Sequence, residues 1–353
     1  MKKVYINSVA SIAAQKTFDN TTFLEDVTHY TETVLPLIDP NYKEFIPPAA
    51  ARRMAKGVKM GVVASRLALQ EANLENVEAI ITGTGMGCVR DSEKFVSAII
   101  DNNEQYLTPT SFIQSTHNTV GGQIALGLNC KGYNFTYVHS STSFESALLD
   151  AKLMLACDEA KTVLVGGVDE LGDHTVKIHR LINHIKQAPV NSAQLLESKT
   201  EGAVFAEGAN FFVLANELQK TSYAEVAAVK TYNTITSTVT QVVEQFIADN
   251  NLLINDVDAV VLGYNGDVTY DLPYDELQKQ LFANIPQLYY KHLCGEFNTA
   301  SSFGFWLGAR VLKEQRVPVA VQLNAQTKKE YKNILLYNQY RGKDHSLTLL
   351  RKC

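Results

Sequence analysis

The segment Phe135–Leu155, FTYVHSSTSFESALLDAKLML, contains the pattern that decides the fold. Its first residues alternate as in a β-strand, and the spacing of its later apolar residues predicts a helix from Ser141 to Ala156. A sharp turn between such a strand and helix commonly presents a nucleophile at the helix N-terminus. The question is whether Ser141 does chemistry or stands where a nucleophile has been lost.

Strands and helices alternate on both sides of this segment. Strands are predicted at 3–10, 78–87, 134–138, 161–170, 224–233, 258–266, 333–340 and 346–352, with two short strands within 202–214, and helices at 50–74, 141–156, 238–252, 274–285 and 299–315. This alternation predicts an α/β fold with largely parallel sheets. Because the order of elements repeats after about residue 218, we predict an N-terminal half at 1–218, containing the nucleophile-elbow position, and a shortened C-terminal half at 219–353, packed as one compact domain.

Composition excludes several classes of function. The 353 residues are 46% hydrophobic and 20% charged, which is typical of a folded globular protein. A net charge of −5, with no run of Lys or Arg longer than a pair, argues against nucleic acid as a partner. The N-terminus does not resemble a signal peptide, and no apolar stretch is long enough for a membrane span, so we expect a cytoplasmic protein. The cysteines (Cys88, Cys130, Cys157, Cys294 and Cys353) are predicted to be free thiols, and no metal or cofactor is expected.

Five motifs occur in a fixed order along most of the chain. They are RRMAKGVKMGVVASRLALQEANL (52–74) with IITGTGMG (80–87), GGQIALGLNCKGYNFTYVHSS (121–141), AKTVLVGGVDE (160–170), EGAVFAEGANFFVLANE (201–217) and YKHLCGEFNTASSFGFWLGARVLKEQRVP (290–318). Each motif alone is weak, but together they resemble the β-ketoacyl-acyl carrier protein synthases. The resemblance implies a thiolase-like fold with duplicated α/β/α/β/α layers.

The family's catalytic set is a cysteine, two histidines and a lysine. By this resemblance, the nucleophile falls on Ser141, counted back from Gly166-Gly167, and the histidines fall on Asn265 in LGYNGDVTYD and Glu296 in CGEF. Only the lysine is retained, as Lys291. Serine is a poor nucleophile unless a base takes its proton, and asparagine cannot act as that base. A carboxylate at 296, anionic if exposed, would repel a developing oxyanion. We therefore interpret Ser141 as the site of a lost nucleophile.

The resemblance then implies a subunit of the chain-length-factor type, inactive on its own. Such a subunit pairs with an active ketosynthase, as a heterodimer, or with itself, and works with acyl carrier protein in fatty-acid-like, polyketide or aryl-polyene biosynthesis. The segment Phe112–Leu128 and the strand Tyr133–Val138 are expected to form the interface. Two alternatives remain open: a stand-alone acyltransferase or thioesterase using Ser141, and a scaffold that binds carrier protein.

Other residues admit a chemical and a structural interpretation. Ser141 and Glu296 could form an acyl-transfer pair, although such sites normally contain a His or Lys base. Cys294 could be a relocated nucleophile, but buried free cysteines are common. Lys291 could be retained for an ion pair with Glu296. His139 is interpreted as a core or interface residue.

Three further patterns are interpreted as structural. His174, His179 and His184 recur every five residues, a spacing that moves around a helix and does not converge on a metal. The sequence GTGMGC (83–88) lacks the spacing and lysine of nucleotide loops and is predicted to be a tight strand exit. The basic edge of Arg52, Arg53, Lys56 and Lys59 is typical of a solvated face, although an acidic carrier protein could dock there. Near the C-terminus, QYRGKDHSL (339–347) replaces the family's longer glycine-rich gate.

Overall fold

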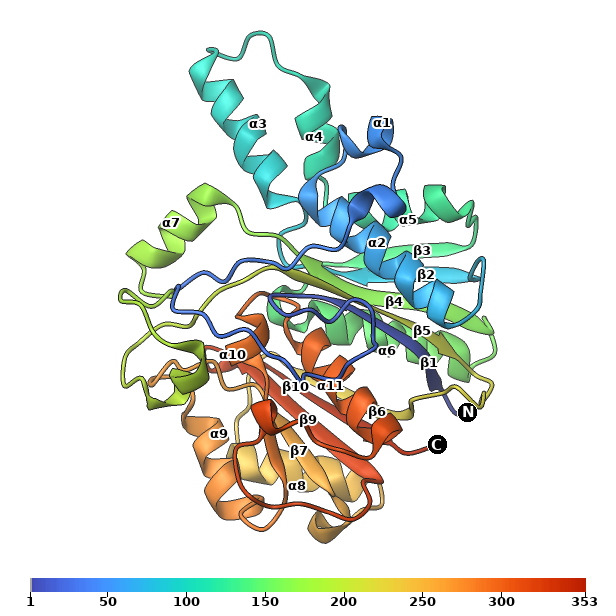
Figure 1. Cartoon of the computed structure of the whole chain (residues 1–353), viewed down its shortest axis with the longest axis vertical. Coiled ribbons are helices and arrows are strands. Elements are labelled where there is room, and N and C mark those ends of the chain that lie inside the picture. The colour runs from blue at the N-terminus through green and yellow to red at the C-terminus, as the bar shows by residue number, and fades with distance from the viewer. Residues whose placement is uncertain (1) are drawn as a thin grey trace.

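The computed structural model describes residues 2–353 (Figure 1). The strands are β1 (Tyr5–Ile12), β2 (Ala79–Gly83), β3 (Tyr133–Tyr137), β4 (Thr162–Asp169), β5 (Gly208–Ala215), β6 (Ala224–Tyr232), β7 (Ala259–Leu262), β8 (Gln287–Tyr289), β9 (Asn333–Tyr340) and β10 (Lys343–Arg351). The α-helices are α1 (Pro48–Ala51), α2 (Lys56–Glu71), α3 (Val89–Asp101), α4 (Pro109–Ser115), α5 (Thr119–Leu128), α6 (Ser143–Ala156), α7 (Asp173–Leu181), α8 (Val239–Asp249), α9 (Leu272–Glu276), α10 (Lys291–Cys294) and α11 (Ser301–Glu314).

The strands form one ten-stranded array in the order β3-β2-β4-β5-β1-β6-β10-β9-β7-β8. In the first half, β2 pairs in parallel with β3 and β4, while β5 runs antiparallel to β4 and β1. In the second half, β7 pairs in parallel with β8 and β9, while β10 runs antiparallel to β9 and β6. The two halves therefore have the same topology, and they join through the antiparallel pair β1–β6.

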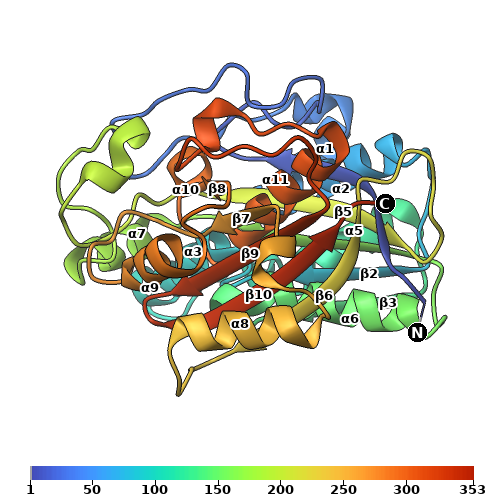
Figure 2. The same cartoon turned by 90° about the horizontal axis from the view of Figure 1, so that it is seen from below.

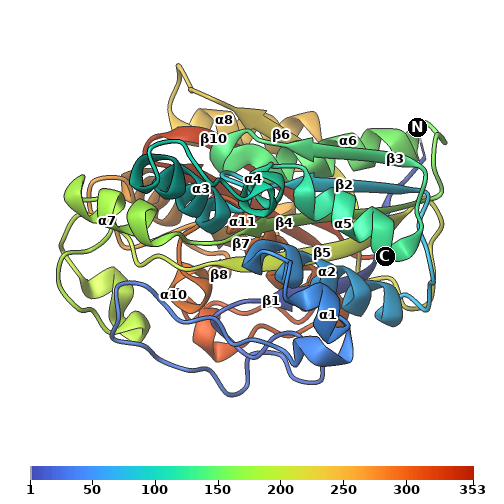
Figure 3. The same ribbon diagram turned by 90° about the horizontal axis from the view of Figure 1, so that it is seen from above.

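The array is layered between helices, with α6 and α11 in the middle. Residues of both helices share one core with strands of both halves. On the outer face of the first half, α2 and α5 cover a second core, and Figure 3 shows them over the strands from above. On the outer face of the second half, α8 covers a third core, which Figure 2 shows from below. The predicted thiolase-like layered fold is confirmed.

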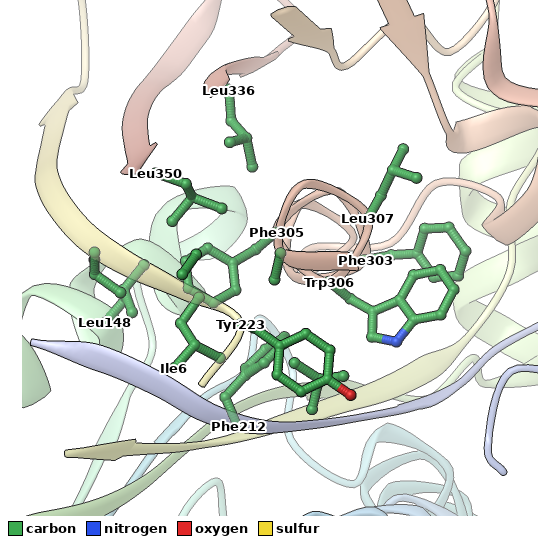
Figure 4. Packing of buried hydrophobic residues seen from close by; sticks show 14 of the residues in the cluster. Ile6, Leu148, Phe212, Tyr223, Phe303, Phe305, Trp306, Leu307, Leu336 and Leu350 are labelled. Atoms are coloured by element: carbon green, nitrogen blue, oxygen red, sulfur yellow. The ribbon is translucent and has the colours of Figure 1, made fainter. Parts of the chain in front are cut away.

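Helix α11 explains why the two halves pack together. Every residue from Ser301 to Leu312 is buried, which is typical of a helix that is enclosed on all sides. Figure 4 shows Phe303, Phe305, Trp306 and Leu307 of this helix among side chains from both halves: Ile6, Leu148, Phe212, Tyr223, Leu336 and Leu350. Strands β1–β5 lie within 1–218 and β6–β10 within 219–353, and this division stays a prediction.

Several predicted elements are corrected by the structure. The helix predicted at 50–74 is interrupted between α1 and α2, and the one predicted at 274–285 continues from α9 into a π-helical turn at Leu277–Leu281. The segment 202–214 contains one strand, β5, preceded by isolated bridges such as Phe205 with Val34 and Glu296. The sheet is mixed and not largely parallel, because the strands of each half reverse at β5 and β10. Strand β8 and helices α3, α4, α5, α7 and α10 were not predicted from the sequence. Of these, β8 and α10 are too short to show a periodic pattern.

Candidate functional site

Ser141 lies at a sharp turn between β3 and α6. A 3-10 turn at Ser140–Thr142 leads directly into the first residue of α6. The φ angle of Ser140 is 54°, an unusual conformation for a residue with a Cβ, and such strain concentrates at functional sites. Ser141 itself is buried. The predicted strand–turn–helix geometry is therefore present.

The hydroxyl of Ser141 is bonded to a residue that the sequence analysis did not single out. Its Oγ donates to Oδ2 of Asp344 over 3.1 Å. The other oxygen of that carboxylate accepts a hydrogen bond from Asn233 Nδ2 at 2.9 Å. The only sequence signal was that the altered segment 339–347 includes Asp344. Glu296 is not the hydrogen-bond partner of Ser141, so the structure does not bring together the acyl-transfer pair considered above.

Asn265, Lys291 and Glu296 do come together. Asn265 follows β7, Lys291 begins α10, and Glu296 follows the turn at Gly295, whose φ is 70°. Oε2 of Glu296 accepts hydrogen bonds from Asn265 Nδ2 at 2.7 Å and from Lys291 Nζ at 2.8 Å. All three side chains are buried, so Glu296 is not the exposed anion that the sequence allowed. The side chains of Asn265, Lys291 and Glu296 are therefore hydrogen-bonded to one another.

The loop that carries Asn265 is fixed by a second carboxyl group. The backbone N–H groups of Asn265 and Gly266 donate to the two oxygens of Asp271 at 3.3 and 2.8 Å. Burial raises the pKa of Asp271 to about 7, against the opposing effect of these N–H groups. On the other side of Gly266, Lys186 Nζ donates to its carbonyl oxygen at 2.8 Å.

A small cavity of about 50 Å³ lies beside Glu296. Its lining is partly apolar and partly acidic: Met86, Val89, Leu171, Phe205 and Phe297 with Asp169, Glu170, Thr175, His179, Glu296, Asn298 and Tyr340. Burial raises the pKa of the Asp169 and Glu170 carboxyls above their usual range. A cavity of this size has room for a few water molecules or a short segment of a chain.

The histidines of the 174–184 segment partly contradict the sequence interpretation. His179 Nδ1 and His184 Nδ1 lie 3.1 Å apart, because α7 ends at Leu181 and the His184 N–H then bonds back to the His179 carbonyl. Burial lowers the pKa of both rings. Even so, within residues 2–353 no group of three or more His, Cys, Asp or Glu side chains is arranged to hold a metal ion.

The surroundings of Cys294 and His139 do not support a catalytic role for either residue. Cys294 is fully enclosed, and burial raises the pKa of its thiol well above the usual value, which disfavours a nucleophilic thiolate. His139 is exposed, and its Nδ1 lies 3.0 Å from Ser146 Oγ, so it is not a core residue of the isolated chain. The interface interpretation of His139 stays open.

The surface predicted to be an interface exposes apolar side chains. They are Phe112, Ile113 and Leu126 in one segment and Tyr133, Phe135 and Val138 in or just after β3, an edge strand.

Of the basic edge, Arg52 and Arg53 are exposed, whereas Lys56 forms an ion pair with Glu207. Within residues 2–353, no helix combines the length and the apolar character needed to cross a membrane.

Comparison with known proteins agrees with this geometry. The family model described as beta-ketoacyl synthase, N-terminal domain, matches residues 15–220. Among solved structures, a beta-ketoacyl synthase from Burkholderia phymatum is 16% identical, with a TM-score of 0.80 over 100% of both chains. The ishigamide ketosynthase/chain length factor is 13% identical, with a TM-score of 0.80 over 100% of this chain and 99% of that one. A type II polyketide ketosynthase, solved in complex with its acyl-carrier protein, is 16% identical, with a TM-score of 0.74 over 100% and 99%.

Proposed function

The chain belongs to the β-ketoacyl synthase family, and from that premise we propose that it is a non-catalytic subunit of the chain-length-factor type. It pairs with an active ketosynthase and shapes the space that receives the growing acyl chain. The observation that carries the proposal is the closed set of contacts in which Glu296 accepts from both Asn265 and Lys291. These groups are directed at one another and not at a substrate.

Condensation needs a nucleophile that holds the acyl chain and donors that stabilise the developing oxyanion. At the corresponding positions this chain has a serine bonded to a carboxylate and a glutamate bonded to a lysine. In both arrangements the groups at these positions are hydrogen-bonded to side chains of the chain itself. The small, partly apolar cavity beside Glu296 supports a role in accommodating part of an acyl chain without reacting with it.

The partner classes follow from the family and from the exposed surface. Similar structures are described as a ketosynthase with a chain length factor and as a ketosynthase with its acyl-carrier protein. The unpaired edge of β3, with Tyr133 and Phe135 exposed, supports a partner of related fold. The proposed pathway is one that makes fatty-acid-like, polyketide or aryl-polyene products.

The test is reconstitution with a ketosynthase that has an intact Cys-His-His set and is encoded beside this chain. We expect the two proteins to co-purify, and the products to change in length when Phe205→Ala enlarges the pocket. Leu253→Ala, at an exposed position, is the matched control. A ketosynthase that makes the same products at the same rate without this chain would contradict the proposal.

A further inference from the structure

Asp344 occupies a strained position beside Ser141. The register between β9 and β10 shifts between Lys343 and Ser346, and Asp344 within this irregularity has a φ of 50°. A residue with a Cβ is held in that conformation only when its surroundings fix it. Here the backbone N–H of Asp344 donates to the Asn233 carbonyl at 2.8 Å, and its carboxylate accepts from Asn233 and Ser141.

A second contact fixes the same strand to the same helix. Ser346 Oγ donates to Oε1 of Glu145 at 2.9 Å. Ser141 lies in the turn before α6 and Glu145 in its first turn, and their partners Asp344 and Ser346 both lie at the start of β10. The position of the Asp344 carboxylate is therefore set by two links between α6 and β10.

We propose that Asp344 is a specificity-determining residue that excludes acyl thioesters from position 141. This inference deepens the proposed function and rests on it. Attack on a thioester by the atom at 141 moves an electron pair onto the carbonyl oxygen, and that charge would develop beside a carboxylate held 3.1 Å from the attacking atom. The same carboxylate disfavours a thiolate at 141.

This assignment moves the main obstacle away from Glu296, where the sequence located it. Lys291 and Asn265 both donate to Glu296, so its charge is compensated within its own contacts. Asp344 receives hydrogen bonds from Asn233 and Ser141, neither of which carries a positive charge. A carboxylate can also act as a general base toward a hydroxyl, and the acylation measurement below separates that role from exclusion.

The experiment uses Ser141→Cys as a reporter in the full-length chain. The rate at which iodoacetamide labels the introduced thiol is followed at neutral pH by peptide-resolved mass spectrometry, which separates it from the native cysteines. Adding Asp344→Asn should raise this rate about tenfold or more, because a larger fraction of the thiol ionises. Adding Asp249→Asn, which removes an exposed carboxylate that pairs with Lys230, is the matched control and should change the rate by less than about twofold.

A second variant guards against misfolding. Asp344→Gly removes the carboxylate and suits a positive φ, so it should fold at least as well as the parent chain and give the same acceleration. Equal labelling rates with and without the Asp344 substitutions would overturn the inference. So would acylation of unsubstituted Ser141 by acyl-CoA that is lost in Asp344→Asn, because Asp344 would then be a base.

The outcomes are distinct from those of the reconstitution. A chain that controls product length with its partner, but whose introduced thiol is insensitive to Asp344→Asn, would overturn this inference alone. A chain whose thiol responds as expected, but which leaves its partner's products unchanged, would overturn the proposed function alone.

Discussion

Lys291 Nζ lies 2.8 Å from Oε2 of Glu296, and both side chains are almost fully buried, at 1% and 3% exposure. Asn265 donates to the same oxygen, so the carboxylate is paired and hydrogen-bonded. Burying a charge pair is costly, and the pair is tolerated only while both partners are present. The contact therefore supports a structural role for Lys291, which by resemblance corresponds to the lysine of the family's catalytic set.

Removing one partner should be strongly destabilising. We expect Lys291→Met to lower the free energy of unfolding by about 3–5 kcal/mol, because Glu296 is left as an uncompensated buried charge. Urea unfolding measures this. The control is Lys279→Met, which breaks an exposed pair with Asp275 and should cost no more than about 1 kcal/mol. If Lys291→Met/Glu296→Leu is no more stable than Lys291→Met, the electrostatic explanation fails.

Asp271 should make stability depend on pH near neutrality. Its pKa is raised by burial to about 7 in the folded chain, above the value of about 3.9 for an unfolded aspartate. Between these two pKa values the folded state holds a proton on Asp271 that the unfolded chain has lost. The stabilisation from this group is therefore full below about pH 4 and is lost as the pH rises through 7.

We expect Asp271→Asn to remove this loss of unfolding free energy, which is at most about 1.4 kcal/mol per pH unit. The measurement compares unfolding curves of the variant and the parent chain at a series of pH values. Asp249→Asn is the control, because the pKa of Asp249 is lowered and its charge is constant over this range. Parallel pH profiles for Asp271→Asn and the parent chain would show that Asp271 is ionised in the fold.

His292 should act in the opposite direction. Burial lowers the pKa of this ring to about 3, and its Nε2–H donates to the Ala320 carbonyl at 2.7 Å. The folded state then keeps His292 neutral while the unfolded chain binds a proton below about pH 6.5, so stability is lost as the pH falls from there toward 3. His292→Gln should flatten this part of the profile, and His174→Gln, an exposed position, should not. A change of the same size in both variants would count against the assignment.

The edge strand β3 should form the contact with a second subunit. We expect a dimer at micromolar concentration by light scattering, and a shift toward monomer in Phe135→Lys, which places a charge on a half-exposed apolar position of β3. Val319→Lys, at a position that is 83% exposed elsewhere on the surface, is the control. A monodisperse monomer of the parent chain, unchanged by the proposed ketosynthase, would rule the interface out.

Ser141 should not accept acyl groups. After incubation with acyl-CoA or acyl carrier protein, we expect the intact mass to be unchanged, because the only hydrogen-bond partner of its hydroxyl in the described chain is a carboxylate. Ser141→Ala should give the same result. An added acyl mass on the parent chain that is absent from Ser141→Ala would support the stand-alone acyltransferase instead.

The fold and part of the site could be predicted because they depend on local patterns. The apolar spacing of Ser301–Glu314, the glycines of β4 and the turn before α6 are visible in the sequence, and their order identified the family. Lys291 and Glu296 are only five residues apart, so a motif carried both. One local prediction failed where the chain changes direction: His179 and His184 meet because the chain reverses after α7.

The sequence by itself identified the family and the layered fold, and by resemblance it predicted that Ser141, Asn265 and Glu296 replace the three reacting groups. Only the tertiary structure decided which side chains these residues contact. Ser141 meets Asp344 across 203 positions of sequence, through an irregular pairing in β10 that no local pattern specifies. Glu296 loses its expected effect because Asn265 and Lys291 reach the same oxygen. Residue type sets which charges are present, but the distance to a compensating partner sets their effect, and that distance exists only in the folded chain.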